Sequence, residues 1–265
     1  MSGVSALLAT LYGSGSTATG SGTSPLVSLR LAEKNRDKEI ARTAKQPETQ
    51  RDIAAFRKAV GKAGTIEKAL SDPAVLKVLL TANGLADQLP YGALAKKVLL
   101  SDLDDPKSLV NRLGDARWKA IATSFDFANQ GLSVLKDPIV QTTLADGYAE
   151  VTWRKQLEAA TPGLSDALDF RERAKSFTTA IQILADPVLR RVVTTAYSIP
   201  PQIAFQELGA QEKAITTRLD IKRLQDPKFV DTLSQRYLLE KQKSVSSSGT
   251  ADLVTLAQQA RGLTV

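Results

Sequence analysis

Six aspartates in or beside Asp-Pro pairs are the residues of this chain best suited to chemistry, because carboxylates bind metal ions and act as acids and bases. They are Asp72, Asp104, Asp105, Asp137, Asp186 and Asp226. All but Asp104 are followed directly by proline. An Asp side chain accepts hydrogen bonds from the free N–H groups of a first helical turn, and proline fits the next position at no cost in hydrogen bonding. The pairs therefore predict five helix starts instead of a catalytic or metal site.

Other residue types that carry chemistry are missing or fit a structural role. The 265 residues contain no Cys and no His, which excludes disulfides, the usual zinc sites and nucleophiles activated by histidine. The GKAGT sequence of residues 61–65 lacks the spacing of a phosphate-binding loop. Trp118, Trp153, Tyr148 and Tyr237 lie in apolar helical registers, which favours core packing over ligand stacking. We therefore predict no catalytic, cofactor-binding or metal-binding residues, no cofactor and no enzymatic activity.

The net charge of +7 is concentrated in one segment. Residues 28–62 contain ten Lys or Arg and five acidic residues, and Phe56 is their only aromatic residue. Interleaved charges of both signs are typical of a solvated helix face, whereas a nucleic-acid surface is more uniformly basic. Binding of nucleic acid through residues 28–62 remains an alternative that the mixed signs disfavour.

Composition and periodicity predict an all-α protein. Hydrophobic residues make up 43% of the chain and charged residues 24%, as in ordinary globular proteins. Apolar residues recur at three- and four-residue spacing, and long alternating strand patterns are missing. No apolar run reaches the roughly 18 residues of a membrane span, and the N-terminus lacks the features of a Sec signal peptide. We expect an irregular multi-helix bundle.

The chain divides into six segments. Residues 1–25 are a flexible Gly/Ser/Thr-rich leader and residues 26–64 form charged N-terminal helices. Residues 65–136 form a first helical repeat, with five short helices between residues 65 and 127. Residues 137–180 are connecting helices that could form a spine between the halves. Residues 181–243 form a second helical repeat, and residues 244–265 comprise a Ser-rich linker and an amphipathic C-terminal helix.

Two pairs of similar sequences indicate a divergent internal duplication. IEKALSDPAVLKVLLTANGL, which contains Asp72, matches IQILADPVLRRVVTTAYSI, which contains Asp186. DPKSLVNRLGDARW, which begins at Asp105, matches DPKFVDTLSQRY, which begins at Asp226. On this alignment the two Asp-Pro pairs lie 33 residues apart in the first copy (105 − 72) and 40 in the second (226 − 186). The copies would then differ by about one loop.

The first repeat also resembles a known family. The runs VLLTANGLADQ and VLLSDLDDPKSLVNRLGDARWKAIATSFDF are similar to the pattern of the bacterial domain-of-unknown-function family 1217. RDIAAFRKAVGKAGTIEKAL, residues 51–70, resembles the lead-in of that family. The resemblance implies a helical protein without established catalytic residues. It also implies a flagellar role, because genes of this family tend to lie in or near flagellar clusters of alphaproteobacteria.

These observations favour a non-enzymatic flagellum-associated structural or assembly protein that acts through protein–protein contacts. Its expected partners are other flagellar proteins, its expected location is the bacterial flagellum or the cytoplasm, and a homo-oligomer is left open. The first alternative is a small-ligand-binding protein or enzyme with a site between the two repeats. The second is the nucleic-acid binder through residues 28–62.

Overall fold

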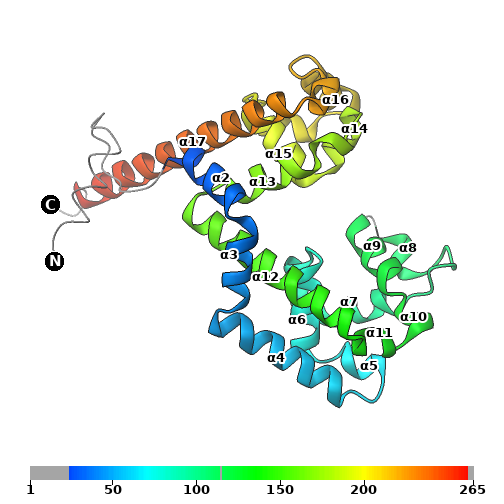
Figure 1. The fold of residues 1–265 in the computed structure, drawn as a ribbon. Helices are drawn as coiled ribbons and strands as arrows, with labels where there is room; N and C mark the ends of the chain where they lie inside the picture. Colours follow the sequence, from blue (N-terminus) through cyan, green and yellow to red (C-terminus); the bar gives the residue numbers. More distant parts are fainter. Residues whose placement is uncertain (1–23, 114, 262–265) are drawn as a thin grey trace, which may run out of the picture.

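The computed structural model describes residues 24–113 and 115–261, and of residue 116 and residues 245–261 it describes the backbone alone. These residues form α-helices and short 3-10 helices and no strand, which confirms the all-α multi-helix prediction. Two lobes are joined by long helices (Figure 1). No helix in the described ranges has the length and apolarity to cross a bilayer. The predicted leader, residues 1–25, lies outside the described part except for its last two residues.

The first lobe contains short helices between two longer ones. Its elements are α4 (Pro47–Lys62), α5 (Ile66–Ala69), α6 (Pro73–Ala82), η1 (Ala86–Tyr91), α7 (Gly92–Leu99), α8 (Leu109–Arg112), α9 (Ala116–Phe125), α10 (Phe127–Gln130), α11 (Ser133–Lys136) and the first half of α12 (Pro138–Ala160). The five short helices predicted between residues 65 and 127 correspond to α5, α6, α7, α8 and α9.

The second lobe continues from the other half of α12. Its elements are α13 (Leu164–Arg173), η2 (Ala174–Ser176), α14 (Ala180–Ala185), α15 (Pro187–Ala196), η3 (Pro201–Phe205), α16 (Leu208–Thr216), η4 (Ile221–Gln225) and α17 (Pro227–Arg261). Helix α17 runs along the whole lobe and extends beyond it (Figure 1).

Each lobe has its own apolar core, and α12 takes part in both. Leu144 and Tyr148 in the first half of α12 belong to a core with Phe56 of α4, whereas Trp153 belongs to a second core with Phe170 of α13. A single continuous helix therefore contributes side chains to the cores of both lobes.

The N-terminal helices strengthen this junction. Helix α2 (Pro25–Lys34) packs against α13 and α17, and α3 (Arg36–Ala44) lies along α12 (Figure 1). The sequence predicts a long helix from Pro25 to about Lys45, but the observed helix is interrupted at Asn35. The interruption lets α2 follow the second lobe while α3 follows α12.

Four of the five Asp-Pro pairs start helices as predicted. The carboxylates of Asp72, Asp137, Asp186 and Asp226 accept hydrogen bonds from N–H groups of the first turns of α6, α12, α15 and α17. Asp105 is the exception, because it accepts from the Lys107 N–H at 2.9 Å in a turn and α8 begins only at Leu109. Ser108 has an extended backbone, and the Asn111 side chain instead ties the turn together through the carbonyl groups of Leu103 and Asp105.

The duplication is present, but its register differs from the predicted one. Residues 52–91 correspond without a gap to residues 166–205, each 114 positions later (166 − 52 = 114). Phe56 and Phe170 are both fully buried, and Thr65 and Thr179 both cap a helix. Helices α6 and α15 both end at a positive φ, of 74° at Gly84 and 51° at Ser198.

The second half of the first copy begins at Asp137, and the second half of the second copy begins at Asp226. The predicted match of Asp105 with Asp226 is therefore wrong, and Asp137 is the counterpart of Asp226. Leu135 and Leu224, two residues before these aspartates, are both fully buried, and α12 and α17 follow them. The two Asp-Pro pairs are 65 residues apart in the first copy (137 − 72) and 40 in the second (226 − 186). The first copy thus has 25 additional residues, and α8 and α9 lie in this part of the chain. Residues 137–180 are therefore the end of one copy and the start of the next.

The predicted Ser-rich linker is also corrected. Helix α17 continues without a break from Pro227 to Arg261, through residues 244–250. Serine costs only about 0.5 kcal/mol relative to alanine in a helix interior. A long helix already held by the second lobe can extend through such residues, since propagation needs no new nucleus.

Candidate functional site

A half-buried carboxylate joins three helices in the first lobe. Asp52 of α4 accepts hydrogen bonds from Lys77 Nζ of α6 at 2.7 Å and from Tyr148 Oη of α12 at 2.6 Å. Burial alone would raise the pKa of Asp52, but the hydrogen bonds from Lys77 and Tyr148 outweigh it and lower the pKa. Burial and the neighbouring Asp52 carboxylate raise the pKa of Tyr148, which keeps its hydroxyl protonated as a donor.

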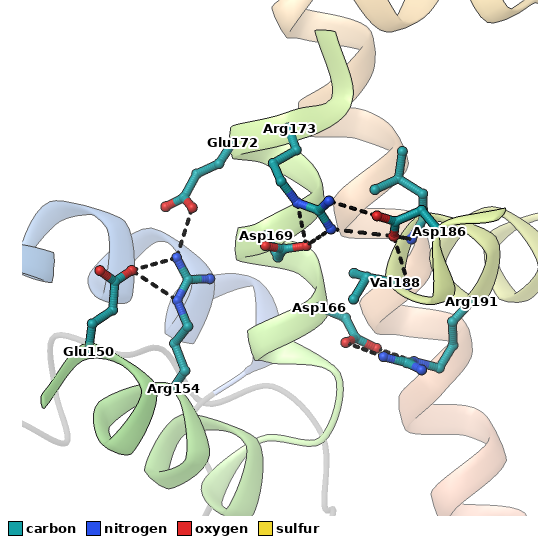
Figure 2. Close-up of polar contacts among 10 residues, drawn as sticks. Glu150, Arg154, Asp166, Asp169, Glu172, Arg173, Asp186, Val188 and Arg191 are labelled. Atoms are coloured by element: carbon teal, nitrogen blue, oxygen red, sulfur yellow. Dashed lines mark hydrogen bonds and ion pairs between the residues drawn. The ribbon is translucent and has the colours of Figure 1, made fainter. Parts of the chain in front are cut away.

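The second lobe repeats this arrangement with Asp166, Arg191 and Tyr237. Asp166 of α13 accepts from Arg191 Nε of α15 at 2.6 Å and from Arg191 Nη2 at 2.7 Å, as Figure 2 shows. Tyr237 Oη of α17 donates to the same carboxylate at 2.9 Å. Burial and Asp166 raise the pKa of Tyr237. Each lobe therefore contains one carboxylate, one cation and one tyrosine that join three helices.

The spacing of the two clusters confirms the corrected register. The aspartate and the cation are 25 residues apart in both lobes. The aspartate and the tyrosine are 96 residues apart in the first lobe and 71 in the second. The difference (96 − 71 = 25) equals the number of additional residues in the first copy. Residues at equivalent places of a duplicated unit that make the same contacts in both copies are best explained as parts of the scaffold.

A second polar network lies where the lobes meet. Glu150 Oε1 of α12 accepts from Arg36 Nη2 of α3 at 2.7 Å. It also accepts from Arg154 Nη2 at 2.8 Å, and Arg154 donates to Glu172 of α13 at 2.8 Å (Figure 2). Arg171 of α13 bridges Glu33 of α2 and Asp231 of α17, each at 2.7 Å. These ion pairs fix the N-terminal helices to the junction.

Asp186 combines helix capping with an ion pair. Its Oδ1 accepts from the N–H groups of Val188 and Leu189, both at 2.9 Å, and its Oδ2 accepts from Arg173 Nη1 at 2.7 Å (Figure 2). Arg173 also pairs with Asp169 one turn earlier on α13. Burial would raise the pKa of Asp186, but Arg173 and the two N–H groups lower it.

The residues singled out in the sequence do not come together at one place. Asp104 lies in the loop before α8, where its N–H donates to Asp102, and the capping aspartates lie at separate helix starts. Within residues 24–113 and 115–261, no three acidic residues are grouped so that they could hold a metal ion. The aromatic residues Trp118, Trp153, Tyr148 and Tyr237 are all buried, as core packing predicts.

Sequence reasoning missed the two carboxylate–cation–tyrosine clusters and the junction network. Asp52 and Asp166 carry no local signal, since neither differs in its local pattern from the other acidic residues of its amphipathic helix. The signal that could have found them is the ungapped correspondence of residues 52–91 with 166–205, which aligns Asp52 with Asp166 and Lys77 with Arg191.

Large apolar side chains remain exposed at equivalent places of the two lobes. Tyr91 at the end of η1 is 58% exposed, and Phe205 at the end of η3, 114 positions later, is 92% exposed. Leu208 at the start of α16 is 52% exposed. Ala204 and Ala210 beside them are exposed as well. We call Ala204, Phe205, Leu208 and Ala210 the apolar tip of the second lobe.

The fold and these contacts define a class of duplicated all-α proteins with two lobes on a shared helical spine. The family model described as "Protein of unknown function (DUF1217)" matches residues 82–230, and the chain belongs to this family. The crystal structure of protein AGR_C_984 from Agrobacterium tumefaciens is similar, with 25% sequence identity and a TM-score of 0.64. The similarity covers 85% of this chain and 97% of that one. The comparison with curated proteins finds no match.

Proposed function

We propose that this chain is a non-enzymatic flagellum-associated structural or assembly protein that acts through contacts with other proteins. The observation that carries the proposal is the exposure of Phe205 and Leu208, which are 92% and 52% accessible. An exposed aromatic side chain next to other apolar ones is typical of a protein-binding surface.

The use of the ionisable groups supports a binding role over a catalytic one. The groups with shifted pKa values in the two clusters are Asp52, Tyr148, Arg191 and Tyr237, and each contacts partners that explain its shift within the fold. Asp166 and Arg191 line a surface pocket, but within it the two side chains are paired with each other, whereas a catalytic group needs to be free to react with a bound substrate. The flagellar part of the proposal is supported by the family resemblance of the first repeat.

The contacts of the basic segment also favour protein contacts over nucleic acid. Arg36 is engaged by Glu150, and the acidic Glu33 and Asp52 within residues 28–62 are paired with Arg171 and Lys77. A phosphate-binding surface depends on basic side chains that are free to neutralise phosphates, and Arg36 is not free in this way. Binding to duplex DNA at low salt, measured by anisotropy, tests this alternative.

The test of the proposed function is deletion of the gene in its own host. We expect impaired swimming or altered filaments, restored by the wild-type gene on a plasmid. Fractionation into cytoplasm, basal bodies and sheared filaments then distinguishes an assembly factor from a structural component. Normal swimming together with normal filaments in the deletion strain would refute the proposal.

A further inference from the structure

The two lobes differ in what covers one helix of each lobe, namely α7 after η1 in the first lobe and α16 after η3 in the second. In the first lobe, α7 follows η1, and α8 and α9 pack against it. Val110, Trp118 and Ile121 of these two helices are buried in the same core as Ala95 and Val98 of α7. Leu94 at the start of α7 is half-buried against this core. The additional residues of the first copy therefore cover this side of the lobe.

Among the residues that the structure describes, the second lobe has no segment that corresponds to α8 and α9. Helix α16 follows η3, and only residues 217–220 separate it from η4. The start of α16 thus has no counterpart of α8 and α9 beside it, and the apolar tip is left open. Phe205 is 92% exposed although it occupies the place of Tyr91, which is 58% exposed. Leu208 is 52% exposed, whereas Leu94, 114 positions earlier, is half-buried against the first core, so the tip is less covered than its counterpart.

The charges of the two segments indicate the chemistry of an occupant. Residues 200–212 contain two ionisable side chains, Glu207 and Glu212, and both are acidic. The segment 107–125, which covers the first lobe, contains four basic residues and one acidic residue. An occupant with basic residues beside its apolar face would therefore complement the tip.

We propose that the apolar tip binds a short amphipathic helix of another protein, with leucine or aromatic side chains on its apolar face and Lys or Arg at its edge. Such a helix would place on the second lobe what α8 and α9 place on the first. The proposal deepens the proposed function by naming the class of partner, but its test does not depend on a flagellar role.

The probe is a fluorescein-labelled peptide of residues 107–125, KSLVNRLGDARWKAIATSF, titrated with the full-length chain and followed by anisotropy. We expect saturable binding that a scrambled peptide does not show. The double variant Phe205→Ser, Leu208→Ser should weaken binding at least tenfold, because it removes the exposed apolar contacts. The matched control is Tyr91→Ser, which removes the exposed aromatic residue at the equivalent place of the first lobe and should leave affinity within twofold.

A second pair of variants keeps the proposal testable if the serine variants lose their fold, which circular dichroism would report. Glu207→Lys with Glu212→Lys should weaken binding of the basic peptide severalfold. Absence of saturable binding by the wild-type chain, or equal binding by the tip variants, would overturn the proposal. Loss of a dimer in the tip variants, seen by sedimentation, would overturn it in favour of a second copy of this chain. Normal swimming of the deletion strain would refute the flagellar role and leave peptide binding unchanged.

Discussion

Substitution of the capping aspartates by asparagine separates two ways in which aspartate stabilises this fold, namely helix capping and ion pairing. Asp72 caps α6 through the Ala74 N–H at 2.8 Å, whereas Asp186 caps α15 and also pairs with Arg173 at 2.7 Å. Asparagine caps helices about as well as aspartate but carries no charge. Asp186→Asn therefore removes the ion pair and the interaction with the helix dipole, and Asp72→Asn removes the interaction with the dipole alone.

The size of the expected loss in the free energy of unfolding depends on how exposed the Asp186–Arg173 ion pair is to water. Hydrogen bonds to charged groups contribute about 1.5–3 kcal/mol when shielded from water. The side chains of Asp186 and Arg173 are 17% and 40% exposed, so screening by water reduces this value. We expect Asp186→Asn to lower the free energy of unfolding by about 1–2 kcal/mol more than Asp72→Asn does.

The sign of the pH dependence follows from the lowered pKa of Asp186. A carboxylate with a depressed pKa in the folded state stabilises the fold fully above its unfolded pKa of about 3.9, and this contribution is lost as the pH falls through the lower folded value. The difference between the wild type and Asp186→Asn should stay constant from about pH 7 to pH 5 and shrink below about pH 4.

The assay is urea denaturation followed by circular dichroism and tryptophan fluorescence. Trp118 lies in the first core and Trp153 in the second, so variants with one tryptophan report each lobe separately. Trp153 should report the loss from Asp186→Asn, and Trp118 the smaller loss from Asp72→Asn. Equal losses from the two variants, or a difference that grows toward low pH, would refute the reasoning.

Further predictions concern backbone and core positions. Gly163→Ala should lower the free energy of unfolding by more than about 1 kcal/mol, because φ is +89° and a Cβ atom would lie 3.1 Å from the Tyr237 ring. Gly61→Ala in α4, where a Cβ atom meets nothing within 4 Å, should raise the free energy of unfolding by about 0.4–1 kcal/mol in the same urea assay. A gain in stability from Gly163→Ala or a loss from Gly61→Ala would contradict these expectations. Leu135→Ala and Leu224→Ala should each cost about 2–5 kcal/mol, since both side chains are fully buried before equivalent helices. A loss below about 1 kcal/mol at either leucine would argue against their equivalence.

Local rules made most of the helix starts predictable. Asp-Pro pairs and capping threonines act within one turn, so the sequence suffices to place α6, α12, α15 and α17. The same rule failed at Asp105, where the conformation of Ser108 and the contacts of Asn111 keep residues 106–108 out of a helix. A cap makes a helix start favourable but does not enforce one.

The sequence by itself determined the all-α class, most of the capped helix starts, the burial of both tryptophans, Tyr148 and Tyr237, and the correspondence of Asp72 with Asp186. Helical periodicity and capping depend on residues a few positions apart, and these are visible in a single chain. Tertiary structure decided the rest. It aligned Asp137 with Asp226, brought Tyr148 to Asp52 across 96 residues, and left Phe205 exposed while α8 and α9 covered the first lobe. These features depend on which helices meet, and packing between distant segments sets that.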